Sequence, residues 1–386
     1  MKLLALALIL FSAQALASNP VPFLPIEVRG FSTSDDFSTT TSLKYNSEVE
    51  SDELTFSPIP CKYLRLINHH DTQLCAAVGS LSKTRFFVDQ QFLITAPVTD
   101  KTYFRAQWSK HQDYSSETVG QFVEFLIPVF NHTYLGIHGE YDADKANDDI
   151  GLSIDKRFRQ SVLRWQSTFH DFTRNGRNES DDEFTITPVT HSLSYFKTQN
   201  ANSYYLNAVV EPLVHWENPS SSTAVRRSRH SLDGFFKTSE FYSSILYSLD
   251  ELQVNTSFQN SQYVKWHFQS QQTWGLWGFR YVDKLWTTDQ GQLRHFDSLP
   301  FVWLPWIIPH RHWDLGLEMT WHRSVGDSLL KDSDDKSSAT EYRANVRWAL
   351  IQSATTSFHI LFTFDLDRFG TGETWEGGNG QFTMTF

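Results

Sequence analysis

Ten charged residues of both signs sit at alternating positions inside strand-length stretches of the sequence. A wall that opposes such charges across a passage selects solutes by the sign of their charge. The same residues can also simply neutralise one another, because a buried charge without a partner is costly. Both interpretations stay open for this set: Arg157, Arg164, Arg280, Arg343, Arg347, Glu140, Asp155, Glu211, Glu318 and Asp365.

The stretches that carry these charges alternate with period two, which is typical of a β-strand with two unlike faces. In 311–323, apolar side chains fall on one face and Asp314, Glu318 and other polar residues on the other. Trp313 and Trp321 end the apolar face, about 27 Å apart at ~3.4 Å per residue. A strand that crosses a membrane between aromatic girdles has this pattern. The predicted girdle residues are Trp313, Trp321, Trp216 and Trp348.

From Thr84 onward the alternation recurs in seventeen segments, at 84–95, 101–111, 119–129, 133–142, 149–158, 161–172, 184–197, 202–217, 233–249, 251–258, 262–270, 273–284, 292–304, 311–323, 341–351, 355–366 and 380–386. Short and long connections alternate between most of them, as in barrels with short periplasmic turns and long outer loops. Bacterial barrels have even strand numbers. We therefore predict an all-β, transmembrane, antiparallel up-and-down β-barrel of about 16 strands (range 14–18), in which a strand near Lys62 would bring the number to 18.

Composition agrees with this fold class. Aromatic residues make up 15% of the chain and charged residues only 20%. No run of about 18 apolar residues follows the N-terminal region, so no spanning helix is expected. The net charge of −11 argues against nucleic acid as a partner. Glycine, at 18 residues, is sparse for a barrel, and an exported soluble β-sandwich is the alternative fold.

The chain divides into three parts. Residues 1–17 have the charged start, short apolar run and small-residue end of a signal peptide. Residues 18–53 are rich in Pro, Ser and Thr and predict a loosely ordered extension, or a plug in the barrel mouth. Residues 54–386 form the predicted barrel, and 54–83 hold Cys61 and Cys75, which in an exported protein predict a disulfide.

The last strand ends with apolar residues at alternate positions, Phe382, Met384 and Phe386. This ending resembles the C-terminal strand of Gram-negative outer-membrane β-barrels of the porin-like class, without pointing to a subfamily. The resemblance implies insertion by the outer-membrane assembly machinery through this strand. It also implies an outer-membrane location, with membrane lipids and lipopolysaccharide as partners.

Motifs for catalysis and metal binding are weak. The chain lacks a G-x-S-x-G sequence, and in the pairs His191–Ser192 and His230–Ser231 neighbouring side chains point to opposite strand faces. Two histidine groups, His310-x-His312 with His322 and His69-His70-Asp71, could bind a metal only weakly. A Cys61/Cys75 site with His69 and His70 is a further option. We assign no catalytic residue, metal ligand or cofactor.

A basic group at Arg226, Arg227, Arg229 and His230 falls in a predicted long outer loop, where it could pair with lipopolysaccharide phosphates or remain solvated. Acidic loops could bridge to the same lipid through divalent cations. The function that the sequence favours is a porin-like channel for small hydrophilic solutes. The alternatives are a plugged structural or surface-interaction barrel, and an outer-membrane lipid-active hydrolase.

Overall fold

The computed structural model describes residues 24, 66, 72–82, 85–112, 117–140, 149–170, 183–184, 189–218, 223–289, 291–308, 313–326, 338–353, 355–371 and 374–385. The predicted signal peptide, Cys61, Phe386 and, apart from Leu24, the predicted extension 18–53 lie outside these residues. Within the described part of the chain, no helix has the length and apolar character needed to span a membrane.

Almost every described residue belongs to a β-strand. The strands are β1 (Thr72–Ser82), β2 (Arg85–Pro97), β3 (Tyr103–Gln112), β4 (Glu117–Phe130), β5 (Thr133–Glu140), β6 (Ile150–Arg157), β7 (Ser161–Phe169), β8 (Glu183–Phe184), β9 (Val189–Gln199), β10 (Asn202–Asn218), β11 (Thr223–Lys237), β12 (Phe241–Val254), β13 (Ser257–Gln272), β14 (Gly275–Thr288), β15 (Gly291–Ile308), β16 (Trp313–Gly326), β17 (Ser338–Gln352), β18 (Thr356–Asp365) and β19 (Trp375–Thr385).

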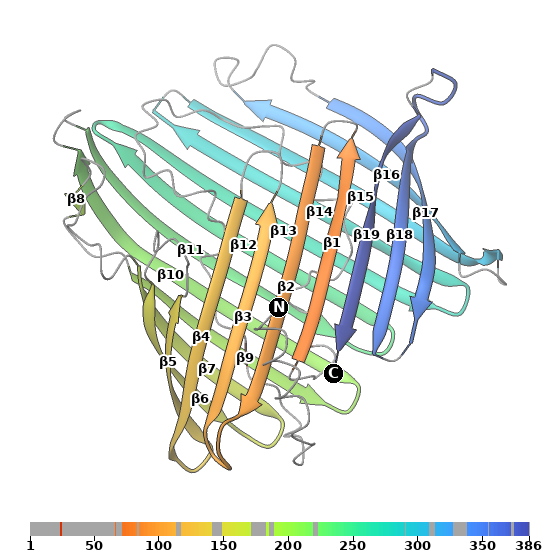
Figure 1. Ribbon diagram of the computed structural model, residues 1–386. Helices are drawn as coiled ribbons and strands as arrows, with labels where there is room; N and C mark the ends of the chain where they lie inside the picture. Colours follow the sequence, from red (N-terminus) through yellow and green to blue (C-terminus); the bar gives the residue numbers. More distant parts are fainter. Residues whose placement is uncertain are drawn as a thin grey trace.

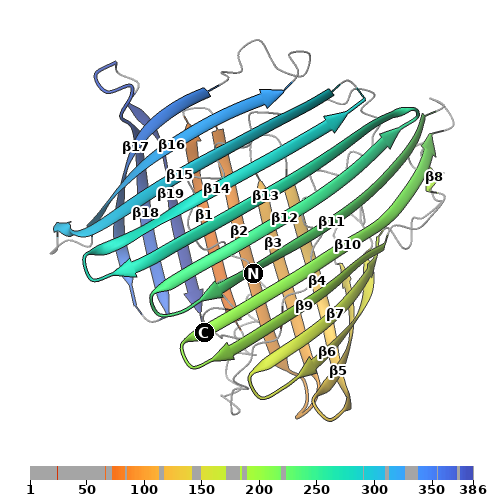
Figure 2. The ribbon, with the colours of Figure 1, turned by 180° about the vertical axis from the view of Figure 1, so that it is seen from behind.

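The strands form one closed antiparallel barrel. Apart from β8, each strand pairs with its neighbours along the chain, with β7 next to β9, and β1 pairs with both β2 and β19, which closes the ring. The two-residue β8 pairs only with the upper part of β10, so the described strands close the barrel with eighteen members. Figure 1 shows β1–β4 in front of the strongly tilted β10–β15, and Figure 2 shows the same wall from behind. The predicted fold class is confirmed, and the strand number is 18 where about 16 was favoured.

The additional strand is β1, and it begins ten residues after Lys62. The seventeen segments predicted after Thr84 equal in number β2–β7 together with β9–β19. The segment 233–249 was wrong in its limits, because it runs across the turn between β11 and β12. The basic group around Arg226 was also misplaced: it lies on β11 and not in an outer loop. Both faces of that stretch carry polar residues, so the alternation that marks a strand is hidden there.

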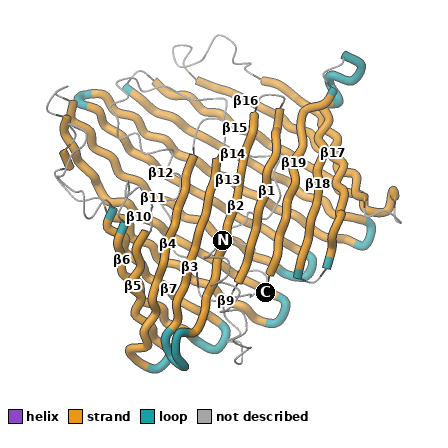
Figure 3. Tube along the Cα trace, viewed as in Figure 1, coloured by secondary structure: helices purple, strands orange, loops and turns teal. Residues whose placement is uncertain are grey.

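The short turns gather at one rim of the barrel, drawn along the lower edge in Figure 3. Asn131–His132 joins β4 to β5, and Asn200–Ala201 joins β9 to β10. His132 and Asn200 have φ angles of 58° and 57°, the left-handed conformation that such tight turns require. The opposite rim mixes long links, such as 327–337, with tight ones, such as Asn255 and Thr256 between β12 and β13. The predicted alternation of link length therefore holds on only part of the chain.

The two faces of the wall are inverted relative to a soluble protein. On β6, Leu152 and Ile154 are exposed on the outer face, while Ser153 and Asp155 are fully buried on the inner face. The same inversion recurs on β4, where Phe125 and its outward neighbours are exposed and Glu124 is buried. A contiguous apolar exterior of this extent suits lipid and not water, and it excludes the soluble sandwich.

Candidate functional site: the polar interior of the barrel

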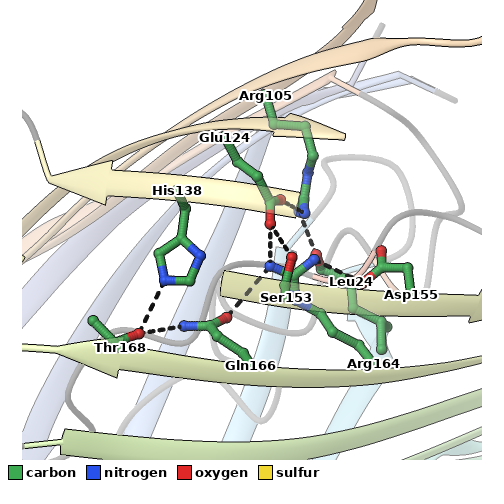
Figure 4. Close-up of polar contacts among 9 residues, drawn as sticks. All are labelled: Leu24, Arg105, Glu124, His138, Ser153, Asp155, Arg164, Gln166 and Thr168. Atoms are coloured by element: carbon green, nitrogen blue, oxygen red, sulfur yellow. Dashed lines mark hydrogen bonds and ion pairs between the residues drawn. The ribbon is translucent and has the colours of Figure 1, made fainter. Parts of the chain in front are cut away.

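A continuous network of charged side chains lines the inner wall from β3 to β7 (Figure 4). Arg105 Nη1 and Arg164 Nη2 each donate a hydrogen bond of 2.6 Å to Glu124, one to each carboxylate oxygen. Arg164 Nη1 also donates to Asp155 Oδ1 at 2.9 Å. All four side chains are at most 1% exposed. Two cations and two anions cancel, so the network is neutral overall.

Strand register brings these groups together. Arg105 lies directly opposite Glu124 across the β3–β4 pair, and Asp155 lies opposite Arg164 across the β6–β7 pair. Between them, β5 presents Gly136, and a Cβ there would lie 2.5 Å from Glu124 Oε1. The missing side chain lets the Glu124 carboxylate reach over β5 to accept a 2.5 Å hydrogen bond from Ser153 Oγ.

Neutral polar side chains extend the network toward the opposite rim. Arg164 Nη2 approaches Gln166 Oε1 at 3.4 Å, and Gln166 Nε2 donates to Thr168 Oγ1 at 3.0 Å. Thr168 Oγ1 is also 3.0 Å from His138 Nε2. Further up the same wall, His170 Nδ1 lies 2.6 Å from Asp149 Oδ2. These contacts link β5, β6 and β7 through side chains on the inner face, although His138 Nδ1 and Arg164 Nε are buried without a hydrogen-bond partner among the described residues.

Arg105 has a second partner that does not belong to the wall. Its Nη2 donates a hydrogen bond to the backbone carbonyl of Leu24. The Leu24 side chain is fully buried and packs in one apolar cluster with inward-facing residues of β7 and β9–β12. The cluster comprises Leu24, Leu66, Val162, Phe196, Tyr205, Phe235 and Tyr242.

The inner wall from β14 to β18 has a different arrangement of charges. The Arg280 guanidinium lies 4.7 Å from the ring centroid of Phe301, and its Nε and Nη1 atoms are buried without a hydrogen-bond partner. Arg343 pairs with Glu341 at 3.1 Å, and Arg347 Nε donates to Asp314 Oδ2 at 2.7 Å.

The structure places the predicted lumen charges on the inner face but does not gather them in one ring. Arg164 and Asp155 belong to the β3–β7 network, whereas Arg280, Glu318, Arg343 and Arg347 lie on the wall from β14 to β17. Arg157 is buried on β6, and Glu140 ends β5. Glu211 accepts from Thr190 Oγ1 at 3.3 Å, and Asp365 lies 3.2 Å from Arg368.

Two central residues, Arg105 and Glu124, were missed by the sequence analysis. Glu124 is a single charge in the run Phe122–Phe130, where both strand faces are otherwise apolar. A single carboxylate within such an apolar run could have identified Glu124 as a buried, paired charge. Arg105 and Gln107 alternate with the apolar Phe104 and Ala106. This is the alternation that predicted the polar face of the other strands, and it could have identified Arg105.

The predicted girdle tryptophans lie on strands whose outer faces are apolar. Trp313 and Trp348 are paired across β16 and β17 and stack with centroids 5.0 Å apart. Trp321 is exposed near the other end of β16 and contacts Phe296. Trp216 is on β10. A girdle at the membrane boundary stays a prediction.

The remaining predicted residues are only partly within the described chain. Cys75 is fully buried in β1, but Cys61 lies outside the described residues, so the disulfide stays a prediction. Phe382 and Met384 pair with β1 and β18 next to the seam of the barrel. The histidines 69, 70, 310 and 312 lie outside the described residues, and within these no cluster of three potential ligands is found.

The outer face holds one polar contact that could bear on the hydrolase alternative. Ser167 Oγ lies 2.6 Å from His191 Nδ1, across the β7–β9 pair, and Trp165 stacks on the His191 ring. His191 was considered with Ser192 in the sequence, but Ser192 is buried on the inner face. Only strand pairing brings Ser167 to this histidine.

The closed ring, polar interior and apolar exterior together define the class: a transmembrane β-barrel of the outer-membrane type. No family model and no curated protein matches this sequence.

Solved structures of outer-membrane proteins resemble this chain over most of its length, but with low sequence identity and low TM-scores. A bacterial polysaccharide outer membrane secretin has 7% identity and a TM-score of 0.41, over 82% of this chain and 99% of that one. OccAB3 of Acinetobacter baumannii has 8% identity and a TM-score of 0.40, over 82% and 98%. OmpT of Vibrio cholerae has 8% identity and a TM-score of 0.38, over 82% and 96%. These values are too low to transfer a role or a residue to this chain.

Proposed function

We propose that this protein is a channel for small hydrophilic solutes in the outer membrane of a Gram-negative bacterium. The observation that carries the proposal is the polar, charged inner face of a closed barrel of eighteen described strands. Barrels of 16–18 strands are wide enough to enclose an aqueous passage, whereas those of eight are filled by their own side chains. Outward-facing residues, such as Ile137 and Leu152, meet lipid and need no other partner.

Ion current across planar bilayers tests the proposal directly. Purified protein that migrates faster on a gel before heating than after it is folded, and such protein should produce stepwise conductance. A folded preparation that never conducts, at any voltage, would contradict the channel. The structural alternative, a barrel closed by its own chain, is supported by Leu24 in the interior and predicts a small current in the intact protein.

The hydrolase alternative is supported by a single observation, the outward Ser167–His191 pair at 2.6 Å. A serine hydrogen-bonded to a histidine is the minimum arrangement for nucleophilic attack on an ester. At the outer face, the substrate would be a membrane lipid. Release of fatty acid from phospholipid vesicles tests it: Ser167→Ala should abolish the release and Ser161→Ala should not. Equal rates for both variants would exclude this pair as the active site.

A further inference from the structure

Two residues that precede the first strand lie within the apolar core of the structure. Leu24 and Leu66 are both 0% exposed and share one cluster with five strand residues. Those five residues, Val162, Phe196, Tyr205, Phe235 and Tyr242, belong to β7, β9, β10, β11 and β12. They are on the inner face, since their strand neighbours two positions away, such as Arg164 and Asp233, are the buried polar groups of the interior.

The five strand residues form an apolar patch on an otherwise polar inner wall. Tyr205, Phe235 and Tyr242 stack in sequence, with centroids 5.8 and 6.0 Å apart. Val162 and Tyr242 are each the second residue of their strand, next to a short turn. The patch therefore lies at the short-turn rim. An apolar surface that faced only water there would be unfavourable, and such patches usually mark a docking surface.

Leu24 connects this patch to a distant part of the ring. Its carbonyl accepts a hydrogen bond from Arg105 on β3, whereas its side chain packs with residues from β7 and β9–β12. Figure 4 shows the Arg105 guanidinium bonded both to the Glu124 carboxylate and to Leu24. Because Leu24 contacts both Arg105 and the apolar patch, it lies between β3 and the strands that carry the patch.

We propose that the chain at Leu24 is docked inside the barrel at its short-turn rim, held by Arg105 and the apolar patch, and that this contact restricts the passage. The docking of Leu24 does not depend on the proposed channel function. The restriction of the passage does rest on that function. Arg105 then has two roles: it supports the wall through Glu124, and it anchors the chain segment through the Leu24 carbonyl.

Accessibility of position 24 to a thiol reagent tests the docking without any measurement of current. Leu24→Cys is placed in a background with Cys61→Ala and Cys75→Ala, and the folded protein is treated with a charged, membrane-impermeant maleimide. Lys101→Cys, in an exposed turn at the same rim, is the access control. The thiol at position 24 should react at least tenfold more slowly than the thiol at position 101. Equal rates would overturn the docking.

Adding Arg105→Met to the Leu24→Cys protein should raise its labelling rate about tenfold, because the hydrogen bond to the residue-24 carbonyl is lost. Arg227→Met is the matched control, since Arg227 is an inner-face arginine that pairs with Asp250 and is not in the Leu24 cluster. An unchanged rate with Arg105→Met, or an equal rise with both substitutions, would overturn the anchoring role of Arg105.

Conductance then tests the restriction separately. Arg105→Met should increase the single-channel current at least twofold over the parent. Leu24→Asp should do the same, and it provides the test if Arg105→Met folds poorly. Leu24 lies outside the strands, so its replacement leaves the wall residues intact. Faster labelling at position 24 with an unchanged current would overturn the restriction. Protection of position 24 in a barrel that never conducts in any variant would instead contradict the channel and leave the docking supported.

Discussion

Arg105 and Arg164 bind the two oxygens of a single carboxylate, that of Glu124, each across 2.6 Å. The two arginines lie on β3 and β7, so one buried side chain ties together strands that are not neighbours in the ring. Buried ion pairs are costly to desolvate, and losing one partner leaves an uncompensated charge. Loss of the Glu124 carboxylate would therefore leave two buried arginines without a shared partner.

Replacing Glu124 with Gln should destabilise the barrel by about 3–5 kcal/mol, because Arg105 and Arg164 would then be buried beside a neutral amide. The midpoint of urea unfolding in lipid vesicles measures this. Asp314→Asn is the comparison, since its partner Arg347 is 42% exposed. An ion pair of that kind is worth about 0–1 kcal/mol. If Glu124→Gln and Asp314→Asn lower the free energy of unfolding by similar amounts, the burial of the Glu124 ion pairs does not add to their contribution to stability.

Gly136→Ala should also lower stability, by roughly 1–3 kcal/mol, because a Cβ there would displace the Glu124 carboxylate. Gly139→Ala on the same strand is the control, where the nearest atom to a Cβ is the Asp149 carbonyl oxygen at 3.6 Å. We expect no loss for that variant. The temperature at which the folded gel band disappears compares the two, and an equal temperature for Gly136→Ala and the parent would contradict the packing argument.

A charge on the outer face should impair folding into lipid. Ile154→Arg, on β6, should cost about 2–4 kcal/mol if that face lies in the hydrocarbon layer. Phe369→Arg, in the β18–β19 connection and 79% exposed, should cost little. Folding yield into vesicles at increasing urea concentration separates them. Normal folding of the Ile154 variant would place that face outside the membrane.

Removing the Arg280 cation should shift ion selectivity. Arg280 is an inner-face residue whose guanidinium lies over the Phe301 ring and has two buried nitrogens without a hydrogen-bond partner. Arg280→Gln should make the channel more cation-selective, seen as a changed reversal potential in a salt gradient. Arg294→Gln, on the outer face and bonded to Asp283, should leave the reversal potential unchanged. If the two variants behave alike, Arg280 does not line the passage.

The strand alternation was visible in the sequence because the two faces of β16 and of β6 meet different surroundings. Leu315, Leu317 and Met319 alternate with Asp314 and Glu318 without interruption. The prediction failed on β11, where Arg226 and His230 make the outer face polar as well. It placed the first strand too early, since nothing in residues 62–82 contrasts two faces as strongly.

The sequence by itself determined most of the strands, because alternation with period two is a local property that separates an apolar from a polar side. That the apolar side faces outward followed only from closure of the ring. Only the tertiary structure decided the partners. That Arg105 shares Glu124 with Arg164, that Ser167 meets His191, and that Leu24 lies against Arg105 all depend on strand register and on closure of the ring. The physical reason is that these contacts join residues far apart along the chain, and a local sequence pattern carries no information about which distant residues meet.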